Sequence, residues 1–289
     1  MKVEVARPDA NPDALEGIPQ PVTALVGIEG ANLYTEVRGS GESVLIVGAA
    51  DEDAEIYRGI AERLAMACKV VTYDRRGTGR SDDEGWPSDS ARHADDAAAL
   101  IEGLNLGRVT VVGASAGGVV ALRLALRHPR LLRTVLCFEP GVFHAVEGGN
   151  ALRLAAELAL EDHLRAHPGD WVGATQALGE AAVNSVDDMA SLFTPPPGRE
   201  WFARRTASHA ESLIRGDLRL TGERFDPQEV ASCPTNLRFS YGTASLPIFR
   251  DIAGRLAAHR NDDPDALDGV SHGIFYHPDT AAQYIAGWI

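Results

Sequence analysis

Residues 108–128 read RVTVVGASAGGVVALRLALRH, a short β-branched run followed by an apolar pattern of helical period. The first five residues favour a buried strand, and a helix is expected from Ala116 onward. Between them lies Gly-x-Ser-x-Gly with Ser115 at its centre. We expect a tight strand-to-helix turn in which Gly113 and Gly117 leave room for neighbouring backbone. Such a turn exposes the Ser115 hydroxyl at the carboxyl edge of a sheet and presents the Ala116 N–H at a helix N-terminus.

The rest of the chain alternates strand and helix patterns around this turn. Further strands are expected at 22–29, 31–38, 44–47, 69–73, 132–138, 235–241 and 262–267, and helices at 55–67, 90–104, 246–259 and 279–288. The first two strands suit an antiparallel hairpin about Gly30, whereas the others imply parallel βαβ units with right-handed crossovers. The sequence therefore predicts an α/β fold with a mostly parallel, doubly wound sheet.

The strand signal disappears between residues 142 and 230, where the pattern is helical, and the βα alternation resumes afterwards. We therefore expect a helical cap at 142–230, inserted into a core made of 22–141 and 231–289. Residues 1–21 hold four prolines among Asp, Ala and Asn, so a flexible N-terminal extension is expected there.

Composition narrows the range of partners. The 27 Lys and Arg residues against 41 Asp and Glu give a formal net charge of −14, which argues against nucleic acid and anionic membrane surfaces. No apolar run is long enough to span a bilayer. The three cysteines form no CxxC pair, which favours reduced thiols in a cytoplasmic protein. We expect no metal and no cofactor, and a small uncharged, apolar substrate; a homodimer is compatible with these features.

A serine nucleophile needs a base, and His272 is the candidate. It stands in Gly269-Val-Ser-His-Gly273, a turn just before the C-terminal helical pattern. In this kind of fold the histidine comes last in chain order. The phosphate-binding alternatives for a glycine-rich turn need Gly-x-Gly-x-x-Gly or Gly-Lys-Ser/Thr, and residues 113–118 match neither.

With these features the chain resembles the α/β-hydrolase superfamily over nearly all of residues 22–289. The turn Asp74-Arg-Arg-Gly-Thr-Gly-Arg-Ser81 is typical of its cofactor-free esterase, lactonase and haloalkane-dehalogenase-like branch. The resemblance implies that Asp74 and Arg76 are scaffold residues. Where the family has His-Gly, this chain has Val47-Gly-Ala-Ala50. Because the oxyanion donor there is a backbone N–H, Ala49, or its neighbour Gly48, remains a candidate beside Ala116.

The acid of the proposed triad departs from the family pattern. The usual aspartate follows the seventh strand, but residues 241–246 contain no carboxylate. Glu139 directly follows the strand after the Ser115 turn, and so reaches the same edge of the sheet. Some dehalogenases and the zearalenone-type lactonases place their acid there, so the resemblance supports Glu139. Asp251 is the second candidate, and Asp263 and Asp265 are weaker ones.

The dehalogenase chemistry itself is excluded because position 115 is serine and those enzymes use a carboxylate nucleophile. We therefore expect a serine hydrolase of a carboxylic ester or lactone, with a macrolactone of the zearalenone kind suggested by the resemblance. The alternative is a non-hydrolytic lyase, cyclase or ligand-binding receptor of the same fold, because the His-Gly pair and the usual acid are absent. The residues expected to line an apolar pocket are Phe143, Trp171, Phe193, Trp201 and Phe202, with His144 and His209 as polar contacts.

Overall fold

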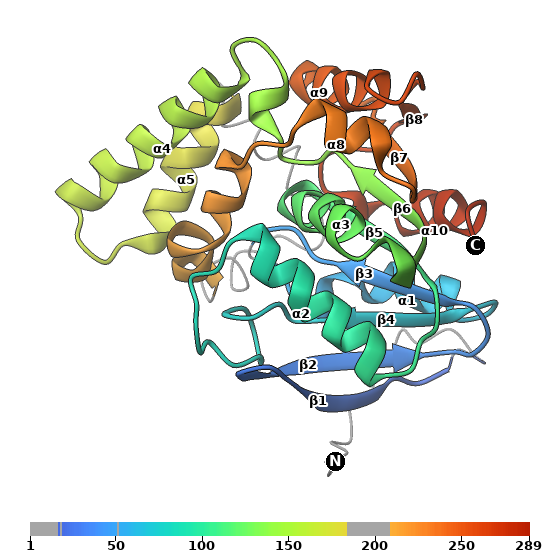
Figure 1. Cartoon of the computed structure of the whole chain (residues 1–289). Helices are drawn as coiled ribbons and strands as arrows, with labels where there is room; N and C mark the ends of the chain where they lie inside the picture. The colour runs from blue at the N-terminus through green and yellow to red at the C-terminus, as the bar shows by residue number, and fades with distance from the viewer. Residues whose placement is uncertain (1–16, 18, 51, 184–208) are drawn as a thin grey trace.

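A computed structural model describes residues 17, 19–50, 52–183 and 209–289. Its centre is an eight-stranded sheet in the order β1-β2-β4-β3-β5-β6-β7-β8 (Figure 1). β1 pairs with β2, and β2 with β4, in antiparallel fashion, and the remaining neighbours are parallel. The strands are β1 Val22–Ile28, β2 Ala31–Arg38, β3 Ser43–Val47, β4 Lys69–Tyr73, β5 Val109–Ala114, β6 Leu132–Phe138, β7 Asn236–Gly242 and β8 Asp265–Leu267.

Helices cover both faces of the sheet, because the central strands are apolar on both sides. Leu45 and Val47 of β3 pack into the core under α2, α3 and α9, whereas Val44 and Ile46 pack under α1 and α10 (Figure 1). The helices are α1 Arg58–Leu64, α2 Ser90–Gly103, α3 Ser115–Arg127, α4 Gly149–Ala166, α5 Trp171–Val183, α8 Pro227–Ser232, α9 Pro247–Ala258 and α10 Pro278–Ala286. The predicted α/β fold is confirmed.

The chain between β6 and β7 is helical where the structure describes it. α4 and α5 form a hairpin that projects beyond the sheet (Figure 1). The 3₁₀ helix η4, Asp217–Gly222, brings the chain back toward α3 before α8. Three of the expected pocket residues, Phe193, Trp201 and Phe202, lie outside the described residues, as does most of the expected extension at 1–21.

The serine turn is tighter than the sequence pattern suggests. β5 continues through Gly113 to Ala114, and α3 begins at Ser115 itself, with no residue of irregular backbone between them. A Cβ on Gly113 would lie 2.3 Å from the carbonyl oxygen of Gly117, and one on Gly117 would lie 2.3 Å from that of Val47. The predicted need for glycine at both positions is thus confirmed, because helix and strands approach one another through these two residues.

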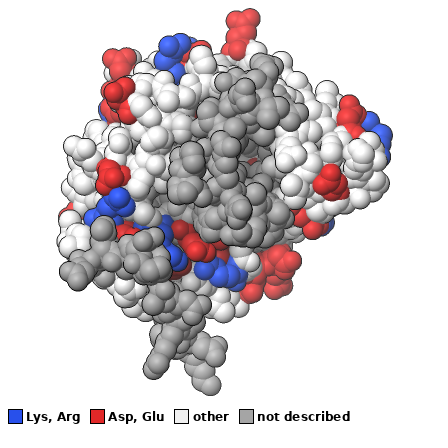
Figure 2. Space-filling model, turned by 180° about the vertical axis from the view of Figure 1, so that it is seen from behind, with Lys and Arg blue, Asp and Glu red and all other residues white. Residues whose placement is uncertain are grey.

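Acidic and basic side chains are mixed on the face shown in Figure 2. In Figure 2 acidic and basic residues lie interspersed around the rim of one face, and no continuous basic area is visible among the residues drawn in colour. In the described part of the chain, no helix has the length and apolarity required to cross a bilayer.

Candidate active site

Ser115 and Glu139 leave two neighbouring strands at the same level. β5 and β6 are parallel, and their register pairs Ala114 with Phe138, so the next residue on each strand is Ser115 and Glu139. Both adopt a left-handed backbone conformation, with φ of 49° at Ser115 and 43° at Glu139. Positive φ is uncommon outside glycine and is concentrated at functional sites, where the surrounding structure enforces it. The two turns therefore bring a hydroxyl and a carboxyl to one point of the sheet edge.

The Glu139 side chain is fully buried and is held at both oxygens. Its Oε1 accepts a hydrogen bond of 2.8 Å from the backbone N–H of Gly242, at the end of β7. A Cβ on Gly242 would lie 2.0 Å from the carbonyl oxygen of Val270, so only glycine allows the segment leading to His272 to pass this close. Because Gly242 has no side chain, the end of β7 contacts both Glu139 and the loop that carries His272.

His272 lies against Glu139. The distance from His272 Nδ1 to Glu139 Oε2 is 2.6 Å, although the two residues are 133 positions apart in the chain. Because an ionised carboxylate only accepts hydrogen bonds, the imidazole donates from Nδ1, and Nε2 is left as the basic nitrogen. No hydrogen bond joins Ser115 Oγ to His272 within the described residues. In enzymes without substrate such contacts are often long and tighten only in the complex.

The residue preceding His272 is fixed by a second histidine. Nε2 of His277 accepts a hydrogen bond of 3.2 Å from the Ser271 N–H and lies 3.1 Å from its Oγ. Burial lowers the pKa of His277, which keeps its imidazole neutral and able to accept. This local contact ties the His272 loop to the start of α10.

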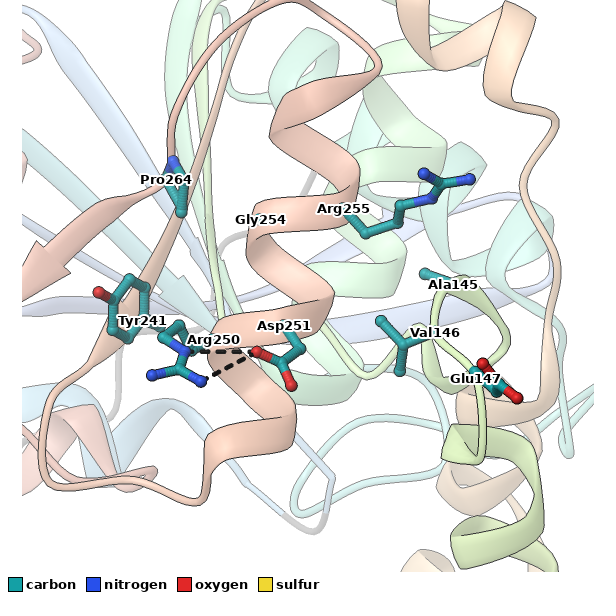
Figure 3. Close-up of a pocket in the computed structure, with 9 residues that line it drawn as sticks. All are labelled: Ala145, Val146, Glu147, Tyr241, Arg250, Asp251, Gly254, Arg255 and Pro264. Atoms are coloured by element: carbon teal, nitrogen blue, oxygen red, sulfur yellow. Dashed lines mark hydrogen bonds and ion pairs between the residues drawn. The ribbon is translucent and has the colours of Figure 1, made fainter.

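Asp251, the second candidate for the acid, lies elsewhere. It is exposed on α9, where the guanidinium of Arg250 donates to its Oδ1 at 3.3 Å. Figure 3 shows the pair in an open groove of about 700 Å³ between α9 and residues 145–147. None of the three proposed catalytic residues lines this groove. The carboxylate that the structure brings to His272 is Glu139.

The two proposed oxyanion donors differ in availability. Ala116 lies in the first turn of α3, where backbone N–H groups have no partner within the helix. The Ala49 N–H, by contrast, donates to Glu52 Oε2 at 2.8 Å and lies 3.3 Å from the Tyr57 hydroxyl, which itself donates to the same carboxylate. The Ala49 N–H therefore already has a hydrogen-bond partner in this conformation, and its role as an oxyanion donor stays a prediction. A substrate oxygen would have to displace the Glu52 carboxylate from Ala49.

Arg75, which the sequence interpretation did not single out, holds the same loop from its carbonyl side. Its buried guanidinium donates to the carbonyl oxygens of Gly48 at 3.1 Å and Ala49 at 2.8 Å. It also forms a bidentate pair with Asp217 of η4, at 2.7 and 2.9 Å. The sequence offered little to indicate this role of Arg75 beyond its position next to Arg76, because the partners of Arg75 lie far away along the chain.

The two residues expected to be scaffold make structural contacts. Asp74 accepts hydrogen bonds from the Ala54 N–H at 2.7 Å and from the backbone and side chain of Arg80. Arg76 makes a bidentate pair with Asp96 of α2, with both N–O distances at 2.8 Å. Together they anchor the turn after β4 to the elements on either side of it.

The remaining pocket candidates are dispersed. Phe143 starts the 3₁₀ helix η3, four residues after Glu139, and packs edge-on against Phe249 of α9, with ring centroids 6.1 Å apart. Trp171 begins α5 at the far end of the hairpin, because the 18 residues of α4 extend about 27 Å from their start beside Phe143. The structure therefore does not bring Trp171 to the other site residues.

Neither of the two histidines considered as polar contacts joins the proposed triad. His209 lies 3.9 Å from Asp53 and lines a separate cavity of about 590 Å³ with Arg80, Trp86 and others. The pKa of His144 is lowered, mainly by burial and then by Arg224. Within the described residues no group of three or more His, Cys, Asp or Glu side chains is placed to hold a metal ion.

Comparisons with known proteins agree with this architecture. A family model described as the α/β hydrolase fold matches residues 43–205, which is more than half of the chain. An uncharacterized hydrolase of Bacillus subtilis, YraK, is 36% identical over 149 residues, covering 50% of this chain and 54% of that protein. A putative carbamate hydrolase of Azorhizobium caulinodans, RutD, is 31% identical over 105 residues, covering 36% and 40% respectively. The alignments thus span about half or less of these curated relatives.

A solved structure shares the fold over nearly its whole length. Est816, described as an N-acyl homoserine lactone degrading enzyme, superposes with a TM-score of 0.71 and 20% sequence identity. The superposition covers 91% of this chain and 99% of Est816. At this identity the likeness establishes the common fold.

Proposed function

The chain belongs to the α/β hydrolase fold family, and from that premise we propose that it is a serine hydrolase of carboxylic esters or lactones. The observation that carries the proposal is the 2.6 Å contact between His272 Nδ1 and the buried Glu139 carboxylate, at the sheet edge where Ser115 leaves β5. A histidine oriented in this way is able to activate a neighbouring serine hydroxyl.

In the proposed mechanism, His272 Nε2 removes the Ser115 proton as Oγ attacks the carbonyl carbon. Glu139 accepts from Nδ1–H, fixes the tautomer and stabilises the imidazolium. The Ala116 N–H, with a donor from the loop at Gly48 and Ala49, stabilises the developing oxyanion. When the tetrahedral intermediate collapses, the C–O bond breaks and His272 gives its proton to the leaving oxygen. Water, activated by His272, then hydrolyses the acyl-enzyme and releases the acid.

We infer an apolar, uncharged acyl group from the side chains around the base. Phe249 stacks on His272, and Phe143 packs against Phe249 from the segment that follows Glu139. A lactone would differ from an open ester only in that the leaving hydroxyl stays attached to the acyl chain. The position of Glu139, which resembles that in zearalenone-type lactonases, favours macrolactones, and Est816 is a lactone-degrading enzyme of the same fold.

A carbamate is the second candidate substrate class, because one relative is described as a putative carbamate hydrolase. The same triad would attack a carbamate carbonyl, with an amine or alkoxide as leaving group. A panel of p-nitrophenyl esters, aromatic lactones and aryl carbamates distinguishes the classes by their kcat/KM values.

The test of the proposed function is the pair Ser115→Ala and His272→Ala. Each variant should lose turnover on the preferred member of the panel by at least a thousandfold, because the nucleophile and base act as a unit. The matched controls are Ser232→Ala on α8 and His259→Ala at the end of α9, which should keep wild-type rates. Full activity in either triad variant would refute the mechanism. Failure of the folded wild-type protein to react with a fluorophosphonate at Ser115 would favour the non-hydrolytic alternative.

A further inference from the structure

Among the described residues, Phe249 makes a ring contact with the proposed base, His272. It is the third residue of α9, which starts at Pro247 directly after the loop that follows β7. Its ring lies over the His272 imidazole, with centroids 4.2 Å apart and planes inclined by 17°. Phe249 is 8% exposed and the His272 side chain 15%, so most of the stack is shielded from solvent.

A hydrogen bond alone does not fix the orientation of an imidazole. The bond from His272 Nδ1 to Glu139 Oε2 fixes one direction in space but allows the ring to rotate about that axis. Rotation would change the direction of Nε2, which has to face Ser115 in the proposed mechanism, without breaking the bond. A parallel aromatic ring on one face removes this freedom, since tilting the imidazole would lose the stacking contact.

The position of Phe249 is itself restricted. Phe143 packs against its ring at 6.1 Å with an interplanar angle of 61°. Farther along α9, which packs on β7, Ile252 and Ala253 are fully buried in the core. The stacking partner is therefore held by two independent elements, η3 and α9.

We propose that Phe249 is a positioning residue for His272, setting the plane of the imidazole while Glu139 sets its direction, so that Nε2 stays directed at the serine side of the site. The inference rests on the proposed serine hydrolase function. The π face also lies where the imidazolium forms during attack, and an aromatic face stabilises a cation.

The test measures the rate at which a fluorophosphonate labels Ser115, together with kcat and KM on the preferred ester. Phe249→Leu keeps an apolar side chain but removes the ring. It should lower the labelling rate and kcat by roughly 3- to 10-fold with KM within twofold of wild type, the range expected for loss of one aromatic pair. Phe249→Tyr keeps the ring and should restore both rates to within twofold.

A matched control is Phe225→Leu, which removes a ring that packs on Arg123 instead. It should leave both rates unchanged. Wild-type labelling and kcat in a folded Phe249→Leu protein would overturn the inference and leave the hydrolase proposal standing, and so would an equal loss in the Phe249→Tyr protein. Absence of labelling in the wild type would overturn the hydrolase proposal itself. Thermal unfolding identifies a variant that does not fold, and Phe249→Met then replaces Phe249→Leu.

Discussion

Two residues of the proposed site adopt a backbone conformation that their side chains disfavour. Ser115 and Glu139 both have positive φ, and each costs on the order of 1–3 kcal/mol relative to a relaxed backbone. The surrounding contacts compensate for that strain: the Gly141 N–H donates to the Ser115 carbonyl oxygen at 3.0 Å, and the Glu139 N–H donates to the Ser240 carbonyl oxygen at 2.8 Å. Backbone strain thus occurs at the two residues that directly follow the paired ends of β5 and β6, where the proposed site lies.

The assignment of the acid is tested by Glu139→Gln. We expect kcat/KM to fall by about 10²–10⁴-fold, because a neutral amide neither stabilises the imidazolium nor selects the tautomer with hydrogen on Nδ1. Asp251→Asn alters a carboxylate that pairs with Arg250 on the surface and should stay within twofold of wild type. Steady-state kinetics on one ester measures both variants. A large loss in Asp251→Asn with little effect in Glu139→Gln would transfer the role to Asp251.

At the scale of elements, the loop after β3 is held by a buried ion pair that bridges to the inserted region. Arg75 joins the carbonyl oxygens of Gly48 and Ala49 to Asp217 of η4, and all of these groups are buried. We propose that the inserted region from 142 to 230 acts as a cap over the site. The chain leaves this region through η4, and the pairing of Asp217 with Arg75 would then set the geometry of the loop that carries a proposed oxyanion donor.

The Arg75–Asp217 bridge predicts separate effects on stability and catalysis. Arg75→Met should destabilise the protein by about 3–5 kcal/mol, because it removes the guanidinium that forms the bidentate ion pair with the buried Asp217 carboxylate. The double variant Arg75→Met/Asp217→Leu should recover most of that stability, since replacing both charges with apolar groups is often neutral. Its kcat should remain at least tenfold below wild type because Gly48 and Ala49 still lack their donor. Urea unfolding and kinetics provide the two measurements; a double variant with wild-type kcat would contradict the bridge's role in positioning the loop.

At the scale of the whole molecule, one buried histidine couples folding to pH. His93 of α2 is 2% exposed, and its pKa is lowered to about 3, first by burial and then by the positive charge of Arg75. In the unfolded chain the imidazole binds a proton below its ordinary pKa of about 6.5. Between these two values the unfolded state holds more protons than the folded state, so stability falls as the pH is lowered.

The corresponding prediction concerns the pH dependence of unfolding. The contribution of His93 should reduce the free energy of unfolding by roughly 3 kcal/mol between pH 7 and pH 4. His93→Gln removes the titrating group, so its free energy of unfolding should change less over the same interval, whatever its value at pH 7. Urea titrations at several pH values measure this difference, with the exposed His167→Gln as the control. An identical pH dependence in His93→Gln and wild type would contradict it.

Much of the fold followed from local patterns in the sequence. The β-branched runs, the helical periods and the Gly-x-Ser-x-Gly turn predicted the α/β architecture. A strand that is buried on both faces is apolar along its whole length, and this pattern can be recognised in a single sequence. The positions of Ser115, Glu139 and His272 at strand ends and turns were also visible there. Their catalytic roles remain predictions, which the variants above test.

The tertiary structure alone decided which side chains meet. The contact between Glu139 and His272 depends on β6 and β7 being neighbours, and the stacking of Phe249 on His272 depends on how α9 packs beside β7. The pairing of Arg75 with Asp217 joins residues 142 positions apart. Apolar periodicity determines which face of an element is buried, whereas strand order and packing determine its partners, and those are properties of the whole chain.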